Sequence, residues 1–266
     1  MPDRRNVFFF YKNTEETKQQ VEALKALPND YNFKAVEDHT KANIIVSVGG
    51  DGTFLQAVRK TGFRDDALYI GINNTDVPSL YADFHTSNTQ KILDAMANEE
   101  IEVRRYPTIS VTIDGQTSFY CLNECTVRSS IIKTFVMEVS IDEKPFETFR
   151  GDGLIISTPT GSSGYNKSVK GAVVDPLLPC LQISELGSLN NNRYRTLGSS
   201  FILSGQRKLT LDIVQDGNDY PVIGMDNEAL SIQHIERIEI KLGDKEVKTV
   251  KLKDNSFWEK VQRQFL

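Results

Sequence analysis

The amino-acid sequence predicts two regions of different class, an N-terminal α/β region with a parallel sheet and a larger β-rich region of β-sandwich type, so that the chain is α+β overall. Residues 1–100 alternate short apolar runs with stretches of helical spacing, which is typical of βαβ units. Residues 101–250 instead carry short runs separated by turn residues. With 266 residues, of which 39% are hydrophobic and 25% charged, the chain is long enough to bury both cores.

The first region is expected to alternate strand and helix throughout. Its predicted elements are, in order, a strand over 6–11, a helix over 14–27, a strand over 43–48, a helix over 53–60, a strand over 67–72 and a helix over 88–100. Thr14 is the first candidate for the N-cap of the first helix, and Thr17 is the second. The run over 43–48 is apolar almost without interruption, as expected for a parallel strand that is covered on both faces.

The second region is expected to consist of hairpins and short strands. Asp114-Gly115 predicts a tight turn inside the run over 108–127, and a second hairpin is expected to turn near residues 142–144. Further strands are predicted over 154–158, 201–205, 208–214, 220–225, 230–242 and 246–252. A last helix over 256–265, with Ser256 as its cap, belongs to a segment of residues 251–266 that is expected to pack back on the first region.

Bulk properties restrict the partners and the compartment. A net charge of −5 argues against a general nucleic-acid binder. The N-terminal apolar run, residues 7–11, is too short for a signal peptide or a membrane span, so no membrane partner is expected. Cys121, Cys125 and Cys180 cannot all pair and have no neighbours that would complete a metal site. Buried free thiols and a cytoplasmic location are therefore predicted.

The stretch "IIVSVGGDGTFLQAV", residues 44–58, contains the first candidate site. Gly49, Gly50 and Gly52 allow backbone N–H groups to converge on a phosphate at the start of a helix. Neither the P-loop nor the Rossmann spacing is present. Asp51 would repel phosphate unless it accepts a proton from an attacking hydroxyl or helps to hold Mg²⁺. The alternative is a structural turn in which the aspartate only caps the helix.

A second candidate site is "FRGDGLIISTPTGSSGYNKS", residues 149–168. A Gly-Asp-Gly triplet precedes a predicted strand, and a turn of small and hydroxylated residues over 159–164 follows it. Hydroxyl groups among glycines suit hydrogen bonding to ribose, adenine or phosphate. Taken alone, the pattern is a weak signal, because turns of serine and glycine are commonly only loops, and its length and order give it weight.

Three blocks together resemble a known family. "GGDGTFL", "LNECTV" and "GDGLIISTPTGSSGYNKS" are similar to the signature blocks of NAD kinases, which use ATP to phosphorylate the adenosine ribose 2′-hydroxyl of NAD. The first block also occurs in diacylglycerol kinases, sphingosine kinases and phosphofructokinases, whereas the third is specific in combination with the second. The resemblance covers most of the chain and is closest in kind to the short bacterial ATP-NAD kinases of low-GC Gram-positive organisms.

The resemblance implies a role for particular residues. Asp51 would be the general base for the ribose hydroxyl, with Gly52 beside it, and Asn123 and Glu124 would hold a ribose diol. The other residues that it places at the nucleotide are Arg150, Asp152, Ser163, Gly164, Tyr165, Asn166, Lys167, Ser168, Gly187 and Tyr194. It further implies ATP or another phosphoryl donor, NAD, a divalent cation (Mg²⁺ or Mn²⁺) with unassigned ligands, and a homodimer or homotetramer in which Tyr194 could serve a neighbouring chain.

One loop departs from the family pattern. Where the family reads close to "NTGHLGFL", this chain has "NNTDVPSLYADF", residues 73–84, so that Pro78 and Ser79 stand in place of flexible residues. The departure bears on the nucleotide contacts of this loop and on the choice of donor. The catalytic and third blocks are intact, so the activity is expected to be kept.

Two other functions are open on the sequence alone. A lipid kinase of the diacylglycerol type would share the glycine-rich turn, would need an acyl-chain cleft and would not need the third block. A non-catalytic NAD or NADP sensor would keep the site without turnover. Asp51 argues against the sensor, because a protein that only binds gains little from a carboxylate that faces phosphates.

Overall fold

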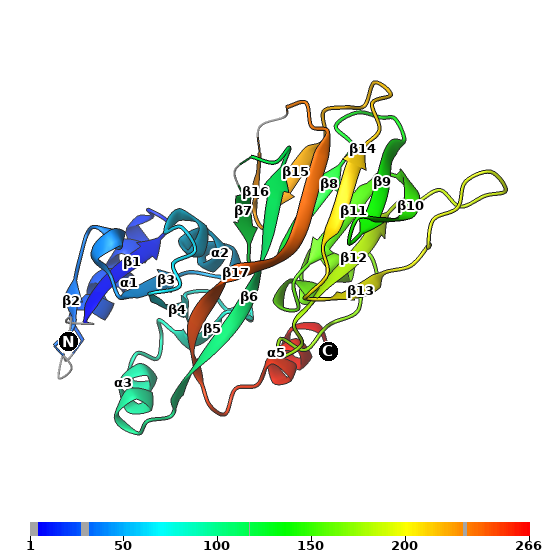
Figure 1. Ribbon diagram of the computed structural model, residues 1–266. Coiled ribbons are helices and arrows are strands. Elements are labelled where there is room, and N and C mark those ends of the chain that lie inside the picture. The colour runs from blue at the N-terminus through cyan, green and yellow to red at the C-terminus, as the bar shows by residue number, and fades with distance from the viewer. Residues whose placement is uncertain (1–4, 28–31, 117, 231–232) are drawn as a thin grey trace. The chain divides into compact units, whose positions relative to one another are not determined.

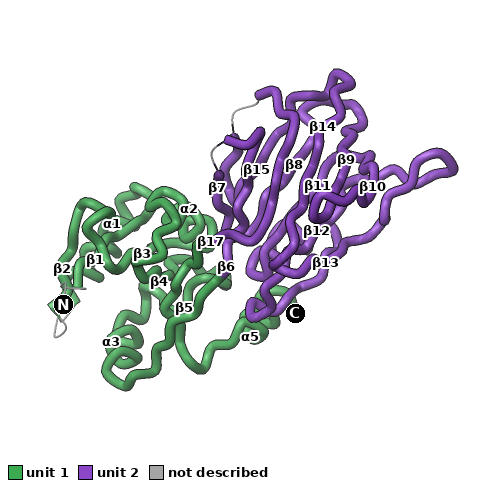
Figure 2. Tube along the Cα trace, in the orientation of Figure 1, with its two compact units in different colours: residues 1–106, 245–266 green, residues 107–244 purple. Residues whose placement is uncertain are grey.

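The computed structural model describes residues 5–27, 32–116, 118–230 and 233–266. Figure 1 shows the ribbon with its elements labelled, and Figure 2 colours the chain by its two compact units. Unit 1 comprises Met1–Tyr106 and Lys245–Leu266, and unit 2 comprises Pro107–Asp244.

Unit 1 contains a parallel sheet with the strand order β2-β1-β3-β4. These strands are β1 (Asn6–Tyr11), β2 (Lys34–Ala35), β3 (Ile44–Val48) and β4 (Leu68–Asn73). Two further segments pair with β4 in the parallel sense, namely β5 (Ala82–His85) and the last residues of β17 (Arg237–Leu252). The parallel α/β class that the sequence predicts for this region is confirmed.

Helices accompany this sheet, four of them at the predicted places, whereas the short 3₁₀ helix over 39–41 was not predicted. They are α1 (Glu15–Lys25), the short 3₁₀ helix η1 (His39–Lys41), α2 (Asp51–Lys60), α3 (Gln90–Ala97) and α5 (Phe257–Phe265). Thr14 caps α1 by accepting a hydrogen bond from the Thr17 N–H at 3.2 Å, as its N-cap position predicts. Ser256 and Glu259 form a reciprocal capping box at α5.

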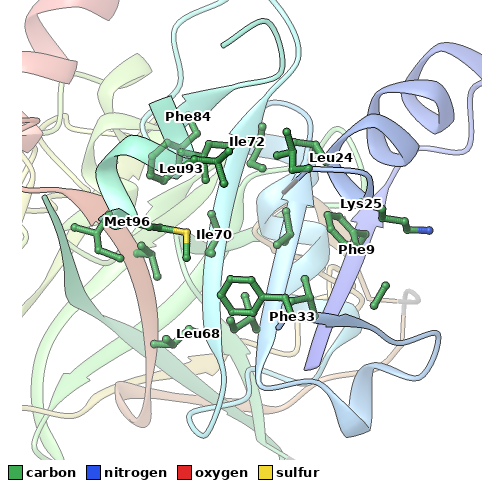
Figure 3. Close-up of a pocket in the computed structure, with 18 residues that line it drawn as sticks. Phe9, Leu24, Lys25, Phe33, Leu68, Ile70, Ile72, Phe84, Leu93 and Met96 are labelled. Carbon is green, nitrogen blue, oxygen red and sulfur yellow. The ribbon is translucent and has the colours of Figure 1, made fainter. Parts of the chain in front are cut away.

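One face of the unit 1 sheet carries an apolar hollow of about 350 Å³. Figure 3 shows Leu24 and Lys25 of α1 on one side of it and Leu93 and Met96 of α3 on the other, with strand residues such as Ile70 between them. The strand side chains that line it alternate with side chains on the opposite face, as the two-residue period of a strand requires.

Unit 2 is a sandwich of two antiparallel sheets. One has the order β13-β12-β11-β8-β15-β16 and the other contains β10-β9-β14-β17, with β6 beside β17 and β7 beside β6. Their bounds are β6 (Ile101–Ile113), β7 (Ser118–Cys121), β8 (Glu124–Arg128), β9 (Phe135–Ile141), β10 (Lys144–Gly151), β11 (Gly153–Ser157), β12 (Cys180–Leu186), β13 (Phe201–Ser204), β14 (Leu209–Ile213), β15 (Val222–Met225) and β16 (Glu228–Ala229). The predicted β-sandwich class is confirmed.

Both predicted hairpin turns are present. Asp114 and Gly115 have φ values of 48° and 68°, and Asp142 and Glu143 have 49° and 62°. Two consecutive positive φ values are characteristic of the type I′ turn, whose twist matches that of the flanking strands. The chain over 237–252 is one long strand rather than two, and residues 231–232 of the run predicted as a strand lie outside the described residues.

The core of the sandwich joins the inner faces of the two sheets. Ile109, Met137 and Leu211 of one sheet belong to the same buried cluster as Leu154 and Ile183 of the other. Such interdigitation of alternate residues is what holds two sheets face to face. The three cysteines, Cys121, Cys125 and Cys180, are all free and buried, which confirms the prediction from the sequence.

Candidate active site

The glycine-rich turn joins β3 to α2 in unit 1. Gly49 has a φ of +149°, and a Cβ built on it would lie 2.5 Å from Thr53 Oγ1, so only glycine fits there. Around Gly50 and Gly52, by contrast, an added Cβ would meet nothing within 4 Å. The positive end of α2 therefore faces open space, which suits an approaching phosphate.

The carboxylate of Asp51 is held by the loop that precedes β5. It accepts hydrogen bonds from the backbone N–H groups of Leu80 at 3.0 Å and Tyr81 at 3.1 Å, and from the hydroxyl of Ser79. The N-cap residue of α2 is Gly50, without a side-chain bond, so Asp51 does not cap its own helix. The loop therefore holds the carboxylate in one orientation, and the carboxylate is not used to cap α2.

The loop that holds Asp51 is itself anchored to α2. The ring of Tyr81 stacks on Phe54 with centroids 4.7 Å apart and an interplanar angle of 5°. The Ser79 hydroxyl also accepts a hydrogen bond from the Ala82 N–H at 2.8 Å. Ser79, which replaces a family glycine, therefore belongs to the environment of the carboxylate.

In unit 2, the second block forms the turn between β7 and β8. The carboxylate of Asp226, a residue with φ of +54°, accepts hydrogen bonds from three consecutive N–H groups: Leu122 at 3.1 Å, Asn123 at 2.7 Å and Glu124 at 3.3 Å. A carboxylate that accepts hydrogen bonds from three consecutive backbone N–H groups holds the backbone of the turn in place. The backbone that carries the side chains of Asn123 and Glu124 is consequently held in place.

Glu124 is a buried carboxyl group that is only partly satisfied. The residue is 7% exposed, and Oε2 has no hydrogen-bond partner in the described part of the chain. Burial, and secondly the negative charge of Asp226, raise the pKa of Glu124 to about 8. At neutral pH the group is therefore mainly protonated and can donate as well as accept a hydrogen bond.

The third block packs directly against this turn. A Cβ on Gly161 would lie 2.0 Å from the Asn123 carbonyl oxygen, so glycine is required for the close approach. A Cβ on Gly164 would lie 3.3 Å from Glu124 Oε2 and 3.5 Å from Asn123 Nδ2. The structure thus brings Asn123, Glu124 and Gly164 together, although 41 residues separate Asn123 from Gly164 in sequence.

After β11, the block continues through the 3₁₀ helix η2 (Thr160–Ser163) and the single turn α4 (Tyr165–Ser168). Tyr165, Lys167 and Ser168 are exposed. Asn166 is fully buried, and its amide group bonds the Ser162 and Ala172 carbonyls and the Ser184 hydroxyl. Ser163 is also buried, and its hydroxyl donates to the Thr160 carbonyl at 3.1 Å.

The remaining candidate residues of unit 2 form two neighbouring groups. Asp152 and Gly187 are among the residues that line a hollow of about 550 Å³. A Cβ on Gly187 (φ +53°) would lie 2.5 Å from Asp152 Oδ2, so the two residues are adjacent. The guanidinium carbon of Arg150 lies 4.6 Å from the ring centroid of Tyr194, a cation–π contact within one chain.

Two residues of these sites were not selected from the sequence. Asp226 lies outside the three signature blocks, and its structural signal is an aspartate at positive φ. For Ser79, the sequence indicates only that a flexible residue of the family pattern is replaced. Its contact with Asp51 spans 28 residues and depends on how the loop folds, so no local pattern could have indicated it.

Among the described residues, no group of three or more histidine, cysteine or acidic side chains could hold a metal ion. No helix in the same part of the chain is long and apolar enough to cross a membrane.

Comparison with known proteins identifies the family. The model of the ATP-NAD kinase C-terminal domain matches residues 122–252. NAD kinase 2 of Bacillus licheniformis is 64% identical over 266 residues, all of both chains. The chain belongs to the NAD kinase family. NAD kinase 2 of Bacillus subtilis (strain 168) is 65% identical over 263 residues, 99% of this chain and 98% of the relative.

Solved structures of the family share the fold. A yeast NADH kinase complexed with NADH has a TM-score of 0.83 at 16% identity, covering 98% of this chain and 87% of its own. An NAD kinase from Archaeoglobus fulgidus in complex with ATP has a TM-score of 0.74 at 23% identity, covering 97% and 98%. The family predicted from the three blocks is confirmed, and neither the lipid kinase nor the non-catalytic sensor is supported.

Proposed function

We propose that this NAD kinase transfers a phosphoryl group from ATP, or from another phosphoryl donor, to the 2′-hydroxyl of the adenosine ribose of NAD, giving NADP. The observation that carries the proposal is the Asp51 carboxylate, which is fixed by three donors beside the open, positive end of α2. Sequence identity of 64–65% to curated NAD kinases, over nearly the full length of the chains, supports the same reaction.

Asp51 is assigned the role of general base. An ionised carboxylate offers about four acceptor positions, and Ser79, Leu80 and Tyr81 occupy three of them. The fourth position can accept the proton of the 2′-hydroxyl. The ribose 2′-oxygen then attacks the terminal phosphorus of the donor, and the bond between that phosphorus and the leaving group breaks. The fixed carboxylate thus contributes orientation as well as proton transfer. Phosphoryl transfer otherwise depends on alignment and charge neutralisation.

Asn123 and Glu124 are assigned to a ribose diol. The buried Oε2 of Glu124, which no described group satisfies, would gain a hydroxyl partner on binding. Because Glu124 is mainly protonated at neutral pH, it can donate to one hydroxyl and accept from the other.

The other residues predicted to contact the nucleotide fall into an exposed group and a buried group. Gly164, Tyr165, Lys167 and Ser168 are exposed and are proposed to face the nucleotide. Asn166 and Ser163 are buried and bonded within the protein, which favours a role in shaping the turn. The hollow beside Asp152 and Gly187, together with the Arg150–Tyr194 pair, would contribute further contacts to NAD.

A divalent cation, Mg²⁺ or Mn²⁺, is expected with the phosphoryl donor. The described residues contain no cluster that would form a protein cage, and Mg²⁺ is commonly held by substrate phosphates and water with few protein ligands. The donor phosphates would therefore supply most of its ligands, and no proton-transfer step assigned above depends on it.

The location and assembly of the protein are also proposals. Three buried free thiols favour a reducing compartment, the cytoplasm. A homodimer or homotetramer is proposed, as the family resemblance implies.

The direct test incubates the purified chain with NAD, ATP and Mg²⁺ and detects NADP with an NADP-specific dehydrogenase. An NAD analogue that lacks the adenosine 2′-hydroxyl is the matched control and should give no product. Failure to form NADP with ATP, other nucleoside triphosphates or polyphosphate would refute the proposal.

A further inference from the structure

The C-terminal segment contributes two lysines to the interior of unit 1. Lys251, at the end of β17, is 0% exposed, and Lys260, on α5, is 3% exposed. Lysine is almost never fully buried unless it is paired, because removing its charge from water is costly. The surroundings of these two side chains therefore require an explanation.

Both lysines lie beside one buried carboxylate, that of Asp83 on β5. Lys260 Nζ forms an ion pair with Asp83 Oδ1, Lys251 Nζ lies 3.8 Å from the same oxygen, and the Leu252 N–H donates to Oδ2 at 2.7 Å. Burial alone would raise the pKa of Asp83, but the two lysine charges and the hydrogen bonds outweigh it and lower that pKa. Burial and the charge of Lys260 lower the pKa of Lys251 well below its ordinary value.

The lysines also bind the backbone of the loop that holds Asp51. Lys260 Nζ donates to the Leu80 carbonyl at 3.0 Å, and Lys251 Nζ donates to the Leu80 carbonyl at 3.4 Å and to the Tyr81 carbonyl. An amine donates in either protonation state, so these contacts do not require Lys251 to be charged.

Leu80 and Tyr81, whose carbonyl groups accept hydrogen bonds from the lysines, also donate their backbone N–H groups to the Asp51 carboxylate. The peptide that joins Leu80 to Tyr81 accepts from the lysines at its C=O and donates to the Asp51 carboxylate at its N–H. A peptide that is hydrogen-bonded at both ends to charged groups is polarised, and each bond strengthens the other. The Leu80–Tyr81 segment is thus hydrogen-bonded to the Asp51 carboxylate through its N–H groups and to the two lysines through its carbonyl groups.

We propose that Lys251, Lys260 and Asp83 are positioning residues for catalysis, which orient Asp51 through the Leu80–Tyr81 peptide. This rests on the proposed function, in which Asp51 is the general base. It assigns the C-terminal segment, including α5, a part in the reaction chemistry although none of its residues touches Asp51 in the contacts described. Buried ion pairs are seldom more stabilising than apolar packing of the same volume, so stability alone does not account for the cluster.

The test is a double-mutant cycle on turnover with Lys260→Met, Asp51→Asn and the combined variant. In the wild-type background, Lys260→Met should lower kcat about 10-fold and change KM for NAD by less than about 2-fold, because a small misorientation of a catalytic group is costly for the chemical step. In the Asp51→Asn background, the same substitution should change kcat by less than about 2-fold, since the group it positions is gone.

A control variant and a rescue variant accompany the cycle. Lys248→Met is the matched control and should leave kcat unchanged, because Lys248, on the same strand as Lys251, donates to the Asp65 carbonyl. Lys260→Arg, which keeps the charge and the donors, should recover most of the lost turnover. If Lys260→Met does not fold, Lys260→Gln replaces it in the cycle.

Hydrogen exchange of the segment 79–84 supplies a measurement that does not depend on activity. Exchange of this segment should be about 10-fold faster in Lys260→Met than in the wild type or Lys248→Met, because a bond that protects the loop is lost. Equal kcat losses in both backgrounds, an unchanged kcat in Lys260→Met, or unchanged exchange at 79–84 would each overturn the inference. A wild-type chain that makes no NADP would instead overturn the proposed function, and the exchange result would still decide whether the lysines hold the loop.

Discussion

Two carboxyl groups, one in each unit, have opposite environments. Asp51 accepts three hydrogen bonds from one loop and is held in a single orientation. Glu124 is buried beside another carboxylate, with one oxygen that no described group satisfies. The first environment holds an acceptor in place, whereas burial and the neighbouring Asp226 disfavour the charged form of Glu124. Under the proposed function, proton transfer would be carried out in unit 1 and ribose recognition in unit 2.

The largest expected effect tests the first half of that contrast. Asp51→Asn keeps the shape and removes the charge, so turnover should fall roughly 10²–10⁴-fold, the usual contribution of a general base. The Kd for NAD, measured by calorimetry, should change by less than about 3-fold, because the proposed NAD contacts lie largely in unit 2. The matched control is Asp65→Asn, an exposed aspartate of unit 1. Unchanged turnover in Asp51→Asn would rule out the base assignment.

The second prediction concerns the free energy of unfolding and the pH. The pKa of Glu124 is raised from 4.5 to about 8, so the folded protein keeps a proton that the unfolded chain loses near pH 4.5. This group's contribution to stability is therefore complete below pH 4.5 and is lost as pH rises to about 8. At about 1.4 kcal/mol per pKa unit, the loss should be roughly 3–5 kcal/mol.

Urea unfolding at pH 4.5, 6 and 8.5 measures this effect. The stability of the wild type relative to Glu124→Gln should decline across that range, because glutamine does not titrate. Glu236→Gln, at an exposed position of the same unit, should show no such trend relative to the wild type. A constant difference between the wild type and Glu124→Gln would mean that Glu124 is ionised in the folded protein.

The third prediction addresses the residue that distinguishes the Asp51 loop from the family pattern. Ser79→Ala removes one of the three bonds to the carboxylate and should lower kcat about 10-fold, since a hydrogen bond to a charged group contributes on the order of 1.5 kcal/mol. Ser87→Ala removes a hydroxyl that contacts only the His85 side chain in the bonds described and should leave kcat unchanged. Equal kcat values for Ser79→Ala and the wild type would show that the two backbone N–H groups suffice.

The smallest effect concerns the anchoring of α5. Ser256→Ala removes the hydroxyl that accepts the Glu259 N–H at 3.1 Å and should cost about 1 kcal/mol of unfolding free energy. Because α5 carries Lys260, a modest increase in hydrogen exchange at residues 79–84 is expected as well. Thermal unfolding with exchange mass spectrometry would measure both, and an unaltered melting temperature would show that the cap is not needed.

The class of each unit could be predicted from the sequence because its evidence is local. Continuous apolar runs and helical spacing indicate covered parallel strands and amphipathic helices, and Asp114-Gly115 adopts the two positive φ values that its residue types favour. Thr14 and Ser256 cap the helices that they precede. The prediction was wrong where tertiary pairing decides, since residues 237–252 form one strand rather than two.

The burial of α5 also differs from expectation. The apolar character of Phe257 and Trp258 favours the core face of this helix for both residues. Trp258 is 48% exposed, however, and the buried residue of the helix is Lys260. Burial of a lysine depends on a distant carboxylate and on backbone carbonyls that accept its protons, and the sequence around Lys260 contains no sign of either.

The sequence by itself determined the family, the positions of most elements and the identity of the two carboxylates, because signature blocks and residue periodicity are properties of short segments. Only the tertiary structure decided what surrounds those carboxylates. Ser79, Leu80 and Tyr81 reach Asp51 across about 30 residues, and Asp226 reaches the Glu124 turn across about 100. Hydrogen bonds and charge act over a few ångströms, so their energies depend on which distant segments the fold brings together.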